Sequence, residues 1–249
     1  MKWAFLFSRK ITRNYDRVIL SNEAITAMHR IKTGTDIFYY AHALPHELFD
    51  GHAEYMKTVP FFFHEFYAIA LWLRKRLYLY EIRTISKIMT NSRMNQEWLT
   101  RWSGRNDIMI IHPPVNMLRF HPQKVKESFF IQEHNNVESL IEKEIQDYYI
   151  SPSRLKEKKC IERIIHAFIH MPEKNLIVLY NPHDSDKAII MQMARGYNNI
   201  FFYHEPSDIH IAKIIASSVA TISLAKDENF SMVSIESMAC GIPMISVNE

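Results

Sequence analysis

Residues 228–247, ENFSMVSIESMACGIPMISV, decide the fold of the C-terminal part of the chain. The apolar run at 219–224, just before them, is typical of a buried strand. Inside the quoted stretch, apolar residues recur at helical spacing up to Gly241, a residue type that often ends helices in a left-handed conformation. Pro243 then begins a second apolar run at 244–247. The order strand, loop, helix, turn and strand predicts a βαβ unit.

Two carboxylates flank the predicted start of this helix. Glu228 lies in the loop before it, and Glu236 lies inside it. The amides of residues 229–233 would lie near the helix N-terminus, where unpaired N–H groups and the helix dipole favour phosphate. Carboxylates accept hydrogen bonds from sugar hydroxyls, so the pattern predicts a nucleotide-sugar site. The alternative is that both are solvated charges on an ordinary βαβ unit.

This stretch resembles the signature of the retaining glycosyltransferases of family 4 (glycosyl transferases group 1), which have the GT-B fold. The family pattern is Glu, seven residues and Glu, with Phe-Gly after the first Glu and Glu-Ala-Met-Ala-x-Gly-x-Pro around the second. The matching residues are Glu228, Phe230, Glu236, Met238, Ala239, Gly241 and Pro243. Ser231 replaces the family Gly, and Ser237 replaces the family Ala.

The composition of the chain bounds its class. Its 249 residues can form one large domain or two small ones, and a net charge of +3 gives no nucleic-acid footprint. Cys160 and Cys240 cannot form a disulfide framework, which favours a reducing compartment. No apolar run approaches the ~20 residues of a membrane span, and the apolar start is too short for a signal peptide. We therefore expect a cytoplasmic protein, either free or peripheral at the inner membrane face.

A histidine follows the second predicted strand. Residues 1–35 predict a strand and a helix, and DIFYYA at 36–41 predicts a strand that ends at His42. Ligands bind beside the carboxyl ends of strands in α/β sheets, although a loop His without a role has the same position. Residues 36–50 resemble the family's N-terminal domain, where an aromatic strand runs into a His. The resemblance implies that His42 lies beside the transferred sugar, and it gives Asp50 a weaker match.

Residues 60–83, PFFFHEFYAIALWLRKRLYLYEIR, predict one helical stretch in which basic and aromatic residues alternate. Basic residues attract anionic headgroups and aromatic residues anchor at the interface, so the pattern fits a peripheral membrane contact. It also fits a helix packed on the core with its Arg and Lys side chains in water.

The middle of the chain predicts the end of the first domain. A strand at 84–91, a helix at 93–102 and a strand at 108–111 lead into HPPVNMLRFHP. This segment resembles the family's hinge-side segment, with Asn116 in place of an Asp. Residues 121–147 are charged and contain no Gly, which predicts a linker with a short amphipathic helix.

Two cations follow the first strand of the second domain. The strand is predicted at 148–151, and apolar residues at helical spacing predict a helix at 161–169. Between them, Arg154 offers a planar fork and Lys159 a point charge, a workable pair for a diphosphate. In the family, an Arg-Leu followed by Lys at this spacing binds the donor diphosphate, and Arg154, Leu155 and Lys159 match it. The alternative is a charged loop.

Strands and helices alternate in the rest of the chain, which predicts a parallel, doubly wound sheet. The strands are expected at 176–180, 200–203 and 219–224, and the helices at 187–195 and 208–216. Ser207 is the expected N-cap of the last helix. Compared with the family, residues 181–184 lack glycine and Cys160 stands where Gly is common.

These patterns together predict an α/β, GT-B-like fold with two Rossmann-like parallel-sheet domains. Residues 1–120 are expected to form a partial N-terminal acceptor-side domain, 121–147 a linker, and 148–249 a C-terminal nucleotide-sugar-binding domain, incomplete at its end. In the family, further strands precede the segment that corresponds to residue 15, and further segments follow the one that corresponds to Glu249. We therefore expect an interior piece of an enzyme or a shortened homologue.

The resemblance implies a hexosyltransferase-type retaining glycosyltransferase that moves a sugar from a nucleotide-sugar donor to a sugar or lipid-linked acceptor. The expected roles are catalysis for His42 and Glu228, donor diphosphate binding for Arg154, Lys159, Phe230 and Ser231, and ribose binding for Glu236. Neither a cofactor nor a metal is expected, since no Cys/His spacing suited to zinc occurs. The resemblance also implies that no catalytic metal is needed. The alternative is a non-catalytic fragment that binds nucleotide sugar or a partner chain.

Overall fold

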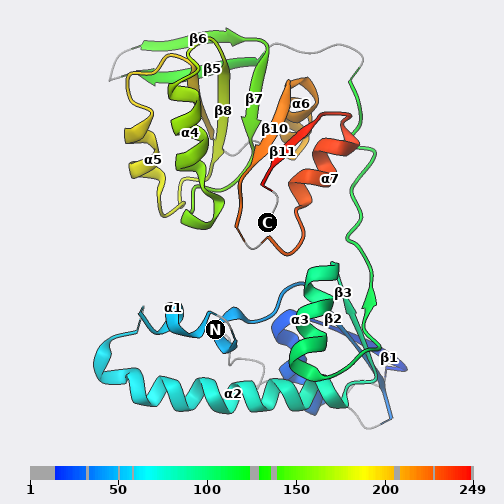
Figure 1. Cartoon of the computed structure of the whole chain (residues 1–249). Coiled ribbons are helices and arrows are strands. Elements are labelled where there is room, and N and C mark those ends of the chain that lie inside the picture. Colours follow the sequence, from blue (N-terminus) through cyan, green and yellow to red (C-terminus); the bar gives the residue numbers. More distant parts are fainter. Residues whose placement is uncertain are drawn as a thin grey trace. The chain divides into compact units, whose positions relative to one another are not determined.

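The fold comes from a computed structural model, which describes residues 15–31, 34–49, 51–57, 59–123, 129–135, 139–204, 208–226 and 228–247. The chain divides into two compact units, Met1–Pro113 and Pro114–Glu249 (Figure 1). The division falls before residue 120, the predicted end of the first domain. Asp50 and Ser207 lie outside the described residues.

Unit 1 contains a four-stranded parallel sheet of order β1-β2-β3-β4. Its strands are β1 (Arg17–Ser21), β2 (Asp36–Ala41), β3 (Lys87–Thr90) and β4 (Met109–Ile110). Its helices are η2 (Asn22–Arg30), η3 (His46–Leu48), α1 (His52–Lys57), η4 (Phe61–Phe63), α2 (His64–Thr84) and α3 (Arg93–Ser103). The predicted strands and helices are therefore present, although the segment after β1 is a 3-10 helix.

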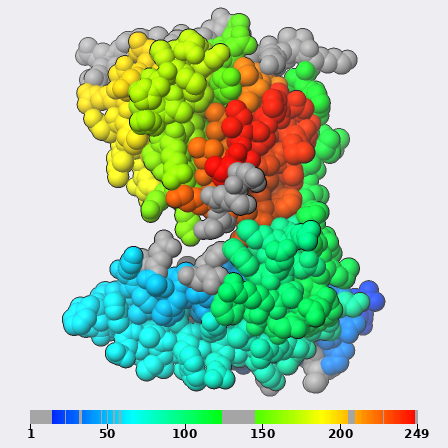
Figure 2. All heavy atoms as spheres, in the orientation of Figure 1, coloured from blue at the N-terminus to red at the C-terminus, as the bar shows by residue number. Residues whose placement is uncertain are grey.

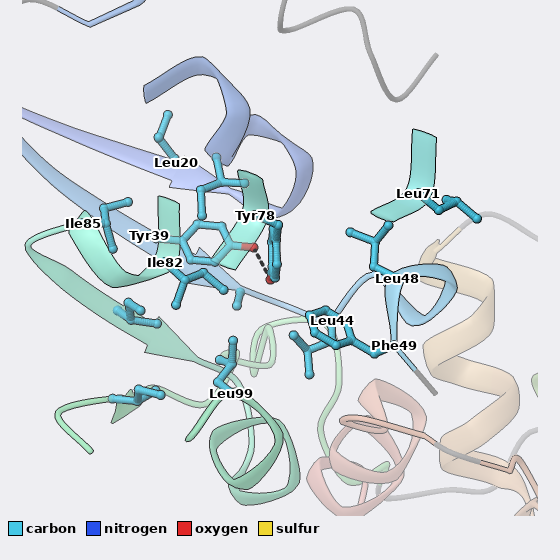
Figure 3. Close-up of a cluster of buried hydrophobic side chains, with 14 residues drawn as sticks. Leu20, Tyr39, Leu44, Leu48, Phe49, Leu71, Tyr78, Ile82, Ile85 and Leu99 are labelled. Atoms are coloured by element: carbon cyan, nitrogen blue, oxygen red, sulfur yellow. Dashed lines mark hydrogen bonds between the residues drawn. The ribbon is translucent and has the colours of Figure 1, made fainter. Parts of the chain in front are cut away.

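Helix α2 supplies a large part of the core of unit 1 (Figure 3). Its buried Leu71, Tyr78 and Ile82 pack among apolar residues from the sheet and from the segment after β2. The hydroxyl groups of Tyr78 and Tyr39 are 3.3 Å apart, a buried hydrogen bond between helix and sheet. One side of the predicted helical stretch at 60–83 is therefore packed on the core.

Unit 2 contains a five-stranded parallel sheet of order β11-β10-β7-β8-β9. Its strands are β7 (Tyr148–Ser151), β8 (Asn175–Tyr180), β9 (Ile200–His204), β10 (Ala220–Ser223) and β11 (Met244–Ser246). Its helices are η5 (Glu157–Lys159), α4 (Ile161–Ile169), α5 (Lys187–Met193), α6 (Asp208–Ser217) and α7 (Met232–Ala239). The strands and the α-helices agree with their predicted places, whereas the short 3-10 helix η5 was not predicted.

Both faces of this sheet are buried. Ile177 and Leu179 of β8 belong to a core cluster with α6, whereas Leu176 and Val178 belong to one with α4 and α5. This is why the strand is a continuous apolar run and not an alternating one. At the end of α7, Gly241 has φ of 73°, the left-handed conformation expected there.

The prediction of an amphipathic helix within residues 121–147 was wrong. This segment forms two antiparallel strands, β5 (Phe129–Asn135) and β6 (Ser139–Ile145), paired from Phe129 with Ile145 to Asn135 with Ser139. Apolar residues in both segments and the Asn-Asn sequence at 135–136 are typical of a hairpin. The spacing of the charged residues also fits an amphipathic helix, which is why the hairpin was not predicted.

Glu81 of α2 is fully buried beside the core of unit 1. Burial raises the pKa of its carboxyl from 4.5 to about 7, against the lowering effect of nearby Arg74. His29 Nε2 approaches Glu81 Oε1 to 3.2 Å but not in hydrogen-bond geometry. Ionised Glu81 is therefore poorly compensated.

We predict that Glu81→Gln stabilises the protein at pH 8 and has little effect at pH 5. Between pH 4.5 and about 7 the folded state holds a proton on Glu81 that the unfolded state releases. The contribution of protonated Glu81 to the free energy of unfolding is therefore complete below pH 4.5 and is lost as pH rises through about 7. The pKa difference corresponds to at most about 3 kcal/mol. Urea unfolding at both pH values measures it, with the exposed Glu65→Gln as control. Equal destabilisation at both pH values would contradict this account.

Candidate functional site

Three loops begin at the carboxyl ends of neighbouring parallel strands in the unit 2 sheet. In the middle of that sheet, β10, β7 and β8 are neighbours and run parallel. The chain moves outward from β7 through β8 to β9, and then crosses to β10 and β11 on the other side. Ligands of open parallel sheets bind at the carboxyl ends of the strands where the strand order reverses. Here that point lies between the loop with Arg154 and Lys159 and the loop with Glu228.

Hydrogen bonds hold these loops against one another. Lys226 N donates to Lys158 O at 2.9 Å, which joins the loop after β10 to the loop after β7. Asp184, in the loop after β8, is buried, and its Oδ2 accepts the amide of Leu155 at 3.0 Å. The same oxygen accepts the amide of Asn181 at 2.9 Å. The loop after β7 is therefore held on both sides.

Lys159 and Glu228 form an ion pair across the switch point. The Lys159 Nζ contacts the Glu228 Oε2, and both side chains are partly exposed. Exposed ion pairs contribute only about 0–1 kcal/mol, so an incoming anion with more charge can replace the carboxylate. The structure thus brings together two residues that the sequence predicted for one site.

Arg154 lies on the β8 side of the same loop. Its exposed side chain lines a hollow of about 70 Å³ together with Ser153, Tyr180, Asn181 and Ile211. The two cations predicted to bind the diphosphate therefore face different neighbours. Lys159 is directed to the loop after β10, and Arg154 to the loop after β8.

The helix that follows Glu228 begins at a serine cap. The Ser231 Oγ accepts the amide of Ser234 at 3.3 Å, so the residue in place of the family Gly satisfies one N–H of the helix start itself. Phe230 lies half-buried just before this cap, and Glu236 lies half-buried further along α7. Phe230 and Ser231, predicted at the diphosphate, and Glu236, predicted at the ribose, thus belong to one short segment.

This segment contains two buried polar groups, of which one is hydrogen-bonded and the other is not. The Ser237 hydroxyl lies 2.8 Å from Thr221 Oγ1 and 3.1 Å from the Ile242 carbonyl oxygen, so the departure from the family Ala ties α7 to β10. The side-chain oxygen of Asn229 is shielded from solvent and has no hydrogen-bond partner among the described residues. A buried acceptor left in this way at the loop after β10 could accept a donor from a ligand.

Cys160, between η5 and α4, is buried and has φ of 51°. This is the left-handed conformation that favours glycine, adopted here by a residue with a side chain. Both Cys160 and Cys240 are free thiols.

His42 lies in unit 1 directly after β2, and three Asn side chains hold its backbone. Its N–H donates to Asn22 Oδ1 at 2.9 Å. Its carbonyl oxygen accepts from Asn91 Nδ2 at 3.0 Å and from Asn95 Nδ2 at 2.7 Å. The exposed ring stands edge-on to Tyr40, with centroids 4.6 Å apart. The sequence pattern pointed to His42 but gave no sign of these amides, since Asn22 precedes it by 20 residues and Asn91 and Asn95 follow it by 49 and 53.

The two units, each built on a parallel sheet with helices, have the architecture of the GT-B fold. The family model described as Glycosyl transferases group 1 matches residues 132–249. The match begins within β5 and covers the rest of unit 2.

Solved structures share the fold at low sequence identity. Sucrose-phosphate synthase from Thermosynechococcus elongatus has a TM-score of 0.68 at 16% identity, over 93% of this chain and 56% of that one. TarM from S. aureus, solved with UDP, has a TM-score of 0.60 at 14% identity, over 92% and 41%. The catalytic domain of starch synthase IV from Arabidopsis thaliana, bound to ADP and acarbose, has a TM-score of 0.55 at 11% identity, over 93% and 56%. The chain thus spans about half the length of these structures.

A comparison with curated protein sequences found no match.

We predict that Asp184→Ala destabilises the protein by about 2 kcal/mol, because the amides of Leu155 and Asn181 lose their buried acceptor. Asp186→Ala is the matched control, since Asp186 lies in the same loop and its side chain caps no helix amide. Urea unfolding of both variants tests this. An equal loss for the two would mean that the Asp184 carboxylate does not hold the loop.

Proposed function

We propose that the chain is part of a retaining glycosyltransferase of the hexosyltransferase type. It would move a sugar from a nucleotide-sugar donor to a sugar or lipid-linked acceptor at the cytoplasmic side of the membrane. The observation that carries this proposal is the Lys159–Glu228 ion pair across the strand-order reversal of unit 2. It supports a shared site because one partner suits phosphate and the other suits sugar hydroxyls.

The proposed mechanism begins with an exchange of partners at Lys159. A donor diphosphate replaces Glu228 at the ammonium group, which frees the Glu228 carboxylate to accept hydrogen bonds from the donor sugar. The Arg154 guanidinium binds the diphosphate from the β8 side. Glu236 accepts hydrogen bonds from the ribose hydroxyls. Phe230 and Ser231 line the phosphate side of the pocket.

Catalysis then rests on stabilising the leaving group. As the bond between the anomeric carbon and the phosphate oxygen breaks, negative charge grows on the departing diphosphate. Arg154, Lys159 and the first amides of α7 stabilise that charge more in the transition state than in the bound donor. The reaction then draws its cations from the chain itself, so we propose that it uses neither a catalytic metal nor a cofactor. His42 would contact the transferred sugar, as the resemblance implies.

A second candidate is a nucleotide-sugar-binding fragment without turnover. The glycine-free turn after β8 and the self-capping Ser231 favour it, since both reduce how closely phosphates approach backbone amides. Transfer or hydrolysis of any donor sugar would exclude this candidate.

We predict that Arg154→Ala and Lys159→Ala each weaken UDP binding by about tenfold or more, because each removes a charged hydrogen-bond donor to phosphate. Lys156→Ala, an exposed lysine of the same loop, should bind like the unchanged protein. Isothermal titration calorimetry measures the affinities. Unchanged affinity in both test variants would remove the diphosphate assignment.

Glu228→Gln should separate binding from turnover. Loss of the ion pair leaves Lys159 unneutralised, so we expect UDP affinity to stay the same or rise. Transfer should fall by at least about tenfold, because the neutral amide is a weaker acceptor for donor-sugar hydroxyls. A parallel fall in UDP affinity would place Glu228 at the diphosphate instead. NMR of the product's anomeric proton in the same assay tests retention of configuration.

A further inference from the structure

The outer face of η4 and α2 is apolar and exposed. We use this name for Phe61, Phe62, Phe66, Ile69 and Leu73, which are 83%, 73%, 70%, 59% and 54% exposed. Atoms of this segment form the cyan part of the unit 1 surface in Figure 2. Monomeric soluble proteins rarely leave large contiguous apolar patches in water, so this face calls for a covering partner.

Helix α2 is apolar on two sides. Its inner side is packed on the unit 1 core through Leu71, Tyr78 and Ile82. The outer face continues along the helix at spacings of three and four residues from Phe66 to Ile69 and Leu73. A hollow of about 270 Å³ lies on this side, lined by Phe66, Ile69, Ala70, Leu73, Arg74 and Leu77. A helix with apolar residues on both sides is normally covered on both.

Aromatic and basic residues border the outer face. Trp72, Arg76, Tyr80 and Arg83 follow one another along the next stripe of α2 and are exposed. The Arg76 guanidinium lies 5.0 Å from the Trp72 ring centroid, a cation–π contact. Glu65 is the exposed acidic residue of the same stripe. The border is therefore net basic and rich in amphipathic rings.

We propose that the outer face of η4 and α2 binds the surface of a bilayer that contains anionic phospholipid. The Phe, Ile and Leu side chains enter the boundary between headgroups and acyl chains. Trp72 and Tyr80 lie at headgroup level, and Arg76 and Arg83 bind lipid phosphates. No helix among the described residues is long and apolar enough to span a bilayer, and α2 lies in the plane of the surface. This contact goes beyond the donor chemistry of unit 2 and gives a lipid-linked acceptor a route to unit 1.

Co-sedimentation with phosphatidylcholine vesicles, with and without phosphatidylglycerol, tests the proposal on the full chain. The unchanged chain should bind the anionic vesicles, more weakly as salt increases. Phe66→Ser with Ile69→Ser should lower the partition coefficient by about tenfold or more. Ile189→Ser with Ile209→Ser is the matched control, since these unit 2 side chains are 67% and 63% exposed, and it should bind normally. Arg76→Gln with Arg83→Gln should remove the preference for phosphatidylglycerol.

Three results would overturn the proposal. The first is no binding of the unchanged chain to anionic vesicles at low salt. The second is equal binding by the Phe66 and Ile69 double variant, with native folding checked by circular dichroism. The third is a dimer in analytical ultracentrifugation that this variant breaks while vesicles remain unbound, which would assign the face to a second copy. UDP calorimetry on the same samples reports separately on the proposed function, so either can fail alone.

Discussion

The parallel pairing of β10 with β7 is the constraint on which the candidate site depends. Ala220 pairs with Tyr149 and Thr221 with Ile150, so the two strands end at the same edge of the sheet. The Lys226–Lys158 backbone hydrogen bond then fixes the distance between the loops that follow. Lys159 and Glu228 meet although 69 residues separate them in sequence. The charges of Lys159 and Glu228 suit them to phosphate and to hydroxyl groups, but the register of β10 against β7 brings them into contact.

The sequence revealed most of the fold because the strands of unit 2 are buried on both faces. A run such as Leu176 to Leu179 has few alternatives to a central strand. The hairpin β5–β6 shows the limit of such reasoning. A hairpin is defined by which residues pair, and the pairing of Phe129 with Ile145 is not visible in the spacing of charges. Local periodicity therefore favoured a helix where pairing across a short turn prevailed.

The same distinction applies to the site. Residue type, spacing and the resemblance to the family singled out Arg154, Lys159 and Glu228, because all three are features of the local sequence. The groups that fix their loops were not foreseeable. Asp184 acts on the amide of Leu155, 29 residues away, and Asn95 acts on the carbonyl of His42, 53 residues away. Hydrogen bonds from a side chain to a distant part of the backbone depend on the tertiary structure, so no local sequence pattern predicts them.

The left-handed backbone at Cys160 shows how such a loop can diverge. A residue with a Cβ in that conformation costs about 1–2 kcal/mol more than glycine, yet the backbone there has φ of 51°. Neighbouring contacts, and not the freedom of the residue itself, must impose that shape. Here the Cys160 N–H donates to the Glu157 carbonyl oxygen and the Arg163 N–H donates to that of Cys160, so the backbone is fixed on both sides of the residue. A left-handed turn held in this way does not require the residue type that adopts it most easily.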